Sequence, residues 1–242
     1  MVFSASHDKT VIQWRIEDGE CLRVFEGHSA PVMGILVTQS GLLVSCAGDC
    51  KVKVWELDAQ PIAVFDLPVR FTTCETLSGH HAIVESLICI EPDVVFSGDT
   101  KGKIIRWSLV TNAAEREFQG HSGGVSCLAV ALIPEEGDNS EFHVLVSGST
   151  GIATPLSLTL VDMKAEPTLV DGSVRVWDIE TGSTLKTLTI HSAGVSCMKV
   201  VYSSKYKCPL LFTGGSDNKT ACCLLSNKLD FPQLARLGLF SA

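Results

Sequence analysis

Short apolar runs alternate with polar turns along the whole chain, and three kinds of run recur. The first kind is small and β-prone, as in VMGILV (Val32–Val37), VSCLAV (Val125–Val130) and VSCMKV (Val195–Val200). The second kind is almost continuously apolar, as in LLVSC (Leu42–Cys46), VVFSG (Val94–Gly98) and HVLVSG (His143–Gly148), which is the pattern of strands covered on both faces. The third kind alternates, as in VKVW (Val52–Trp55) and VRVW (Val174–Trp177). Together they predict an all-β chain of short strands joined by turns.

The third kind of run closes a repeat, because it ends at tryptophan in four places. The runs are Ser4–Trp14, Ser45–Trp55, Ser97–Trp107 and a split run from Ser147 to Trp177, and a fifth, Thr213–Cys223, carries cysteine in the tryptophan slot. Six positions before the end of four runs lies an acid, namely Asp8, Asp49, Asp171 and Asp217. The third run has Lys101 there. Such self-similarity indicates a repeat architecture.

A second marker, centred on histidine, precedes four of the runs. It reads GHSAPV at His28, GHHAIV at His80, GHSGGV at His121 and IHSAGV at His191. In each case a valine follows the histidine by four positions and opens an apolar run. Three of the tryptophans, Trp14, Trp107 and Trp177, lie 14 positions before the next histidine.

In these Gly-His openings and tryptophan closings, and in the Trp177-Asp178 pair, the chain resembles the WD-repeat β-propeller family over nearly its whole length. The resemblance implies a single propeller domain over residues 1–242, with four-stranded antiparallel blades arranged around a channel. About five blades are represented, the first of them partial, and their motifs end near Trp14, Trp55, Trp107, Trp177 and Cys223.

The resemblance also implies a role for the repeated His, Ser or Thr, Asp and Trp residues, which in the family form structural hydrogen-bonded tetrads. The residues in these slots are His28, Ser45, Asp49 and Trp55; His80, Ser97 and Trp107; His121, Ser147, Asp171 and Trp177; and His191, Thr213 and Asp217. With Lys101 in the acid slot, we expect the third tetrad to be weakened. A Ser/His/Asp set that returns in blade after blade is scaffolding rather than an active site, so we expect no catalytic residues and no enzyme.

Composition and charge narrow the alternatives. The formal net charge is −8 without a basic run, which argues against a nucleic-acid partner held through its phosphates. We expect no membrane span, because no uncharged apolar run reaches about 18 residues. No phosphate-binding glycine loop or CxxC framework suggests a cofactor or metal. Four cysteines in apolar runs, Cys46, Cys89, Cys127 and Cys197, are expected to be buried in a reducing compartment, either cytoplasm or nucleus.

An insertion at residues 150–170 interrupts the fourth blade. Without it, Ser147 and Asp171 would have the four-residue spacing of Ser45 and Asp49. The segment is either a recognition loop or intron-like sequence retained in the gene model, and its composition fits both.

Completeness is equally open in the sequence. The first blade begins at its second strand, and the tail Leu234–Ala242 ends where another Gly-His would be due. Three arrangements fit: a five-bladed ring in which the tail supplies the missing strand, a shortened piece of a larger propeller, or closure by another chain. We expect the second.

These observations favour a non-catalytic scaffold that presents a rigid propeller face to a protein or peptide partner, within a larger complex. Candidate contact positions beside the tetrads are His7, Gly48, His81 and Ser216. A first alternative is a propeller domain detached from a larger multidomain protein, such as an enzyme, a motor or a ubiquitin-ligase substrate receptor. A second is an RNA- or chromatin-associated adaptor.

Overall fold

The described residues of the chain form five four-stranded sheets, which we number 1 to 5 along the sequence. The computed structural model describes residues 1–57, 69–71, 74–134, 141–151, 171–225 and 240–241. Within these residues the regular structure is strand, without helix. The chain divides into two compact units, Met1–Phe118 and Gln119–Ala242. The all-β propeller architecture expected from the sequence is confirmed.

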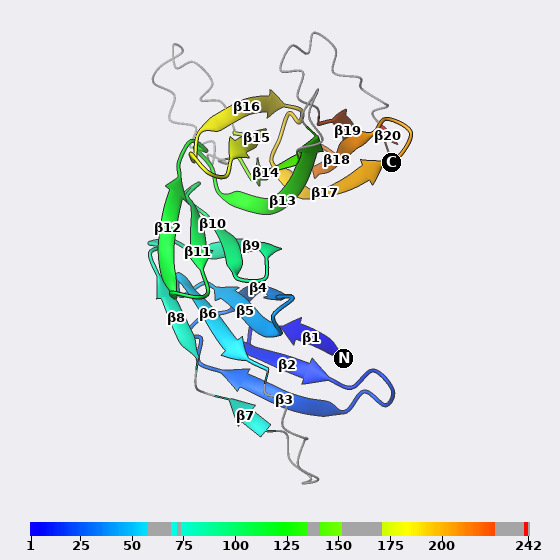
Figure 1. The fold of residues 1–242 in the computed structure, drawn as a ribbon. Helices are drawn as coiled ribbons and strands as arrows, with labels where there is room; N and C mark the ends of the chain where they lie inside the picture. Colours follow the sequence, from blue (N-terminus) through cyan, green and yellow to red (C-terminus); the bar gives the residue numbers. More distant parts are fainter. Residues whose placement is uncertain (58–68, 72–73, 135–140, 152–170, 226–239, 242) are drawn as a thin grey trace, which may run out of the picture. The chain divides into compact units, whose positions relative to one another are not determined.

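Unit 1 contains sheets 1 to 3 (Figure 1). Sheet 1 has the order β1-β2-β3-β7, sheet 2 the order β4-β5-β6-β8, and sheet 3 the order β9-β10-β11-β12. Their strands are β1 (Val2–Ala5), β2 (Thr10–Trp14), β3 (Cys21–Glu26), β4 (Val32–Val37), β5 (Leu42–Ala47), β6 (Lys51–Glu56), β7 (Val69–Phe71), β8 (Glu75–Ser78), β9 (Val84–Glu91), β10 (Val94–Asp99), β11 (Ile104–Ser108) and β12 (Ala113–Phe118).

Unit 2 contains sheets 4 and 5, with the orders β13-β14-β15-β16 and β17-β18-β19-β20. Their strands are β13 (Val125–Pro134), β14 (Glu141–Ser149), β15 (Ser173–Asp178), β16 (Thr184–Thr189), β17 (Val195–Ser203), β18 (Cys208–Gly215), β19 (Lys219–Leu224) and β20 (Phe240–Ser241). Figure 1 shows these sheets in colours that run from green at β13 through yellow at β16 to orange at β17.

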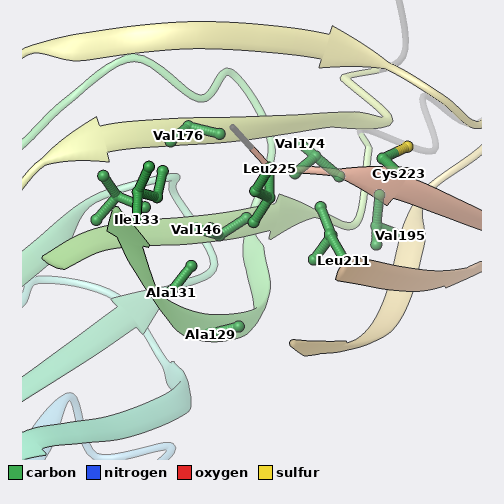
Figure 2. Close-up of a cluster of buried hydrophobic side chains, with 11 residues drawn as sticks. Ala129, Ala131, Ile133, Val146, Val174, Val176, Val195, Leu211, Cys223 and Leu225 are labelled. Carbon is green, nitrogen blue, oxygen red and sulfur yellow. The ribbon is translucent and has the colours of Figure 1, made fainter. Parts of the chain in front are cut away.

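The second strand of a sheet is the buried one, which explains its continuous apolar sequence. Leu43, Val95, Leu145 and Leu211 occupy the same register position, each opposite the residue in the tryptophan slot. Their exposed fractions are all 0%. Small and aliphatic side chains also fill the space between neighbouring sheets. In Figure 2, Ala129, Ala131, Val146 and Val174 of sheet 4 belong to one cluster with Leu211 and Cys223 of sheet 5.

Sheet 1 departs from the other four at both of its edges. It begins with β1, which stands in the register of a second strand because Val2 pairs opposite Trp14. On the far edge, β7 adds in parallel beyond β3. The sheet therefore lacks a first strand among the described residues and has an additional outer one.

The described part of the tail completes sheet 5. Phe240 and Ser241 pair with Thr220 and Lys219 of β19. They therefore occupy a fourth-strand position in sheet 5 instead of the missing first-strand position in sheet 1. A tail strand closing sheet 1 is not what these residues form.

The structure also bears on the expected burial of four cysteines and on the insertion at 150–170. The prediction that Cys197 is buried is wrong: it is exposed on β17, whereas Cys46 is buried and Cys89 and Cys127 are partly buried. The reason is that Cys197 points to the face of sheet 5 opposite the cluster shared with sheet 4. All ten cysteines are free thiols.

Of the insertion at 150–170, only Thr150 and Gly151 are described, and the remainder lies outside the described residues.

Candidate functional site

Three sheets carry a complete buried tetrad with the same geometry. In sheet 2, His28 Nδ1 lies 2.9 Å from Asp49 Oδ2, His28 Nε2 lies 2.8 Å from Ser45 Oγ, and Trp55 Nε1 lies 2.9 Å from the same Oγ. In sheet 4 the matching distances are 3.0, 2.7 and 2.7 Å for His121–Asp171, His121–Ser147 and Trp177–Ser147. The second strand supplies the serine, the third strand the tryptophan, the loop before the first strand the histidine, and the connection between the second and third strands the aspartate.

Donor and acceptor roles in the tetrad follow from the chemistry of its members. An indole N–H only donates, and a carboxylate only accepts. The serine hydroxyl therefore accepts from tryptophan and donates to His Nε2, and His Nδ1–H donates to the aspartate. Every member is satisfied with a neutral imidazole, so a fully buried chain of polar groups costs little.

Electrostatics agree with this assignment. Burial lowers the pKa of His28, and the opposing effect of Asp49 does not overcome it. Burial alone would raise the pKa of Asp49, but hydrogen bonds from Ser29 N–H, His28 and Lys51 N–H together lower it. Asp171 shows the same balance, with a strongly lowered pKa. The tetrad of sheet 2 thus holds the neutral His28 beside the charged Asp49 at neutral pH.

The Gly-His pair has a steric cause. A methyl group on Gly79 would lie 3.0 Å from Trp107 Cη2, and one on Gly120 would lie 3.0 Å from Trp177 Cη2. The corresponding distance from Gly27 to Trp55 Cη2 is 3.2 Å. The indole edge therefore occupies the space that a side chain before the histidine would need.

In sheet 3 the expectation of a missing acid is wrong. His80 Nδ1 lies 2.8 Å from Asp99 Oδ2, while His80 Nε2 and Trp107 Nε1 each lie 2.7 Å from Ser97 Oγ. Asp99 is two residues after the serine rather than four, at the end of β10, and the residue in the expected slot, Lys101, is exposed. Burial would raise the pKa of Asp99, but hydrogen bonds from His80 and the N–H groups of Lys103 and Lys101 lower it.

Sheet 5 explains why the acid can move. Its residue at that strand-end position is Gly215, where a methyl group would lie 2.4 Å from His191 Nδ1 and 2.7 Å from Asp217 Oδ1. The strand end and the turn therefore both approach the same imidazole nitrogen. A carboxylate can reach it from either position.

Sheets 5 and 1 carry incomplete sets. In sheet 5, His191 Nδ1 lies 3.0 Å from Asp217 Oδ1 and His191 Nε2 lies 2.9 Å from Thr213 Oγ1, but Cys223 replaces the indole. Burial would raise the pKa of Asp217, but hydrogen bonds from Ser192 N–H, His191 and Lys219 N–H lower it. In sheet 1, Trp14 Nε1 donates to Ser4 Oγ over 2.8 Å, without a histidine.

Each tetrad positions two loops at the same end of its sheet. The residue three positions after the tetrad hydroxyl donates its N–H to the backbone carbonyl three positions after the histidine. The pairs are Gly48–Pro31, Thr100–Ile83, Thr150–Gly124 and Ser216–Gly194, at 2.8–2.9 Å. Between sheets 1 and 2, Val32 N–H also donates to Ser6 O over 3.1 Å. Within each unit taken by itself, these turns therefore form a backbone-anchored loop rim.

The four contact positions expected from the sequence lie in these rims, three of them in unit 1 and one in unit 2. His7 and His81 are exposed, Gly48 is half-buried, and Ser216 of unit 2 is exposed, with its Oγ 3.0 Å from Ser196 Oγ. Sequence reasoning missed two residues in the same slot, Thr100 and Thr150. Their constant offset of three from Ser97 and Ser147 was a signal that could have found them.

Two exposed apolar side chains on the rim of unit 1 were also missed. Met33, at the start of β4, is 42% exposed, and Ile83, just before β9, is 41% exposed. In sheet 3 the position of Met33, five residues after the histidine, is occupied by Glu85, whose pKa is raised by burial. Apolar residues held at a rigid loop edge are typical of protein-binding surfaces.

The arrangement offers structure rather than an accessible nucleophile. Ser45, Ser97 and Ser147 are fully buried. Ser122, which fits a GxSxG pattern, donates its N–H to Asp171 and precedes a strand instead of the helix that a nucleophile elbow requires. Within the described ranges, no three His, Cys, Asp or Glu side chains gather in a metal-binding group, and no helix is long and apolar enough to cross a membrane.

Unit 2 also has a cavity of about 490 Å³ on sheet 5. Its lining combines strands β17, β18 and β19 and includes Cys197, Lys199, Phe212 and Cys222. Phe212 is 43% exposed there, whereas Val146, in the same register position of sheet 4, is fully buried. This face of sheet 5 is not packed by another sheet of unit 2.

Comparisons with known proteins agree on one family. The family model for the WD domain, G-beta repeat, matches residues 19–56, 113–178 and 182–223, more than half of the chain. The unmatched internal range includes β9, β10 and β11 of sheet 3, where the acid has moved.

Individual relatives are distant. Mitochondrial division protein 1 of Schizosaccharomyces pombe is 26% identical over 81% of this chain and 30% of its own length. Ribosome biogenesis protein YTM1 of Candida albicans is 24% identical over 90% of this chain and 59% of its own length. The crystal structure of the WD40 β-propeller domain of Doa1 superposes with a TM-score of 0.66 at 20% identity, over 96% of this chain and 62% of that one.

The chain thus spans less than two thirds of each of these three relatives. With its Gly-His openings, its buried tetrads and the matched repeats, the chain belongs to the WD domain, G-beta repeat family.

Proposed function

We propose that this protein is a non-catalytic interaction scaffold whose loop rim binds a protein or peptide partner. The observation that carries the proposal is the repeated anchoring of the rim: buried tetrads and backbone hydrogen bonds fix each pair of loops. A surface whose loops are already ordered loses little conformational entropy on binding.

The side chains on the rim of unit 1 suit a protein partner. Met33 and Ile83 supply exposed apolar area, and His7 and His81 supply exposed groups that can donate or accept hydrogen bonds. In unit 2, Ser216 and Thr150 are exposed in the same slots. The ribosome-biogenesis and mitochondrial-division relatives are named for multiprotein processes, which supports a scaffold in a larger complex without indicating which one.

Affinity capture from cell lysate tests the proposal if it compares matched variants. The rim variant is His81→Glu with Ile83→Glu, both at exposed positions, so the fold should tolerate them. The control is Val110→Glu, which is 75% exposed in the turn between β11 and β12, at the other end of sheet 3.

We expect specific partners, quantified by mass spectrometry, that are captured by the wild type and by the control but are depleted with the rim variant. Partners retained by the rim variant would place binding elsewhere. Capture of no protein by the folded wild type would contradict the scaffold function itself.

A further inference from the structure

The outer edge of sheet 2 carries two lysines that hydrogen-bond to hydroxyl groups instead of carboxylates. Lys53 Nζ lies 2.9 Å from Thr76 Oγ1 and 3.3 Å from Cys74 Sγ, and Lys51 Nζ lies 3.1 Å from Ser78 Oγ. In the register of β6 and β8, Lys53 stands opposite Thr76 and Lys51 opposite Ser78. The two cations therefore lie on one face of the sheet, and among the described residues neither forms an ion pair.

Sheet 3 shows that the same position accepts a negative charge. Thr76 in β8 and Glu117 in β12 occupy equivalent register positions, each opposite the residue two before the tetrad tryptophan. The Glu117 carboxylate lies 2.5 Å from the ammonium group of Lys103. Lys103 precedes its tryptophan by four positions, as Lys51 does in sheet 2. An anion in the slot of Thr76 is therefore within reach of the lysines on the third strand.

Thr76 is accessible to a modifying enzyme. Its side chain is exposed, and β8 is an outer strand of four residues at the end of its sheet. A short outer strand opens at a lower free-energy cost than a buried one, so the segment can enter the cleft of a kinase in extended form. The tetrad hydroxyls of Ser45 and Ser97 are fully buried and offer no such access.

We propose that Thr76 is a phosphorylation site whose phosphate is held by Lys51 and Lys53. The step is phosphoryl transfer from ATP by a protein kinase. The bond between Thr76 Oγ1 and the γ-phosphorus forms, the bond from that phosphorus to the β–γ bridging oxygen breaks, the hydroxyl proton passes to a base of the kinase, and ADP leaves. The product carries a charge of about −1.5 to −2 and three acceptor oxygens beside the two ammonium groups.

An attached phosphate suits these lysines because its position is already set by the strand. Thr76 Oγ1 is within hydrogen-bonding distance of Lys53 Nζ before modification, so little further ordering is needed. The phosphate then ties β8 to β6 by charge-assisted hydrogen bonds. Because β8 leads into Gly79 and His80, the modification also fixes the segment that enters the tetrad of sheet 3. None of this depends on the loop rim or on its partner.

The first test compares variants that differ only in charge at this position. Thr76→Glu should melt at a higher temperature than Thr76→Gln, because the carboxylate gains the two ammonium groups and the amide does not. The difference should disappear when Lys51→Met and Lys53→Met are added together, and it should shrink at high salt. Lys199→Met with Lys219→Met, at two exposed residues of unit 2, is the control for lost charge and should leave the difference unchanged.

The second test detects the modification itself. The protein is isolated from its own cells in the presence of phosphatase inhibitors, and tandem mass spectrometry locates phosphate in peptides that contain Thr76 and Ser78. We expect phosphate on Thr76. We also expect phosphatase treatment to lower the melting temperature by about 2–4 °C. A Thr76→Val variant expressed in the same cells is the control, and its melting temperature should not respond to the phosphatase.

Three results would overturn the proposal. One is an equal melting temperature for Thr76→Glu and Thr76→Gln, or a difference that survives the loss of Lys51 and Lys53. Another is the absence of phosphate from Thr76 in the protein from cells, including the case in which Ser78 alone is phosphorylated. The third is a phosphorylated protein whose melting temperature does not change with phosphatase, since the lysines would then not hold the phosphate.

Discussion

At the scale of single residues, the tetrad is a device for satisfying polar groups in a fully covered strand. Ser45 and Ser97 sit at positions with no exposure to water, so each hydroxyl needs partners within the protein. Tryptophan and histidine supply them, and the aspartate links the histidine to the turn. Each hydrogen bond contributes about 1 kcal/mol, but an orphaned buried group costs more.

The relocated acid of sheet 3 leads to a first prediction. Asp99→Ala should lower the free energy of unfolding by roughly 2–3 kcal/mol, because His80 Nδ1–H loses its buried acceptor and the Lys101 and Lys103 N–H groups lose theirs. Lys101→Ala is the control at the position that the spacing assigned to the acid. It should change stability by less than about 0.5 kcal/mol.

Urea unfolding of both variants measures the difference. If Lys101→Ala were as damaging as Asp99→Ala, the carboxylate of Asp99 would not be the tetrad acid.

A second prediction concerns pH. The pKa of His28 is lowered in the folded state, so as pH falls below about 6.5 the unfolded chain takes up a proton first and stability declines. Asp49, Asp99 and Asp171 also have lowered pKa values. Their contribution is present above the ordinary aspartate value of about 3.9 and is lost as the pH falls from there toward the folded-state values.

We therefore expect two declines in the free energy of unfolding on acidification, one between about pH 7 and 5 and one below about pH 4. Denaturant titrations at a series of pH values would show them. A His28→Gln variant, less stable overall, should have a shallower slope in the upper range. An unchanged slope would contradict the assignment to His28.

At the scale of elements, the residue before the tetrad histidine and the residue at the end of the third strand vary together from sheet to sheet. Where an indole fills the end of the third strand, the residue before the histidine is glycine. Where the indole is replaced by Cys223, the residue before the histidine is Ile190, which packs against the cluster that contains Cys223. A large side chain in one of these two slots therefore goes with a small one in the other, because a close-packed interior keeps the total side-chain volume nearly constant.

A double-mutant cycle tests this exchange. Cys223→Trp alone should destabilise the protein, because the indole edge would meet Ile190. Ile190→Gly alone should also destabilise it, by removing apolar packing. The double variant should be more stable than the sum of the two effects, by about 1 kcal/mol or more. Additive effects, measured by thermal and urea unfolding, would show that the slots are independent.

The strand types could be predicted from the sequence, but the partners of the shortest strands could not. The strand types and most of the tetrad residues could be predicted because they depend on the local apolar pattern and on a spacing that repeats along the chain. The pairing of β7 with β3 and of β20 with β19 could not, because the partners are far apart in sequence and these strands are only three and two residues long. Short edge strands carry too little pattern to identify their neighbours.

At the scale of the whole molecule, one face of sheet 5 in unit 2 exposes apolar side chains. Val201 and Phe212 are 47% and 43% exposed on it, beside the cavity that contains Cys197 and Cys222. Their register equivalents in sheet 4, Ala131 and Val146, are buried. Apolar surface of this kind promotes association.

Phe212→Lys should therefore reduce concentration-dependent self-association in sedimentation velocity experiments, because a charge on that face opposes its desolvation. Leu185→Lys, at a 39% exposed residue of β16 in the same unit, is the control for added charge alone. If both variants behave alike, net charge rather than the sheet 5 face determines association.

The amino-acid sequence by itself determined the strand types, the repeat and the set of side chains that form the tetrads, because alternation, spacing and donor–acceptor chemistry are local properties. Tertiary structure decided what depends on distance in space. It showed that Asp99 and not Lys101 meets His80, since strand end and turn converge on one nitrogen. It also exposed Cys197, because burial is decided by which sheet covers which face and not by the pattern of the strand itself.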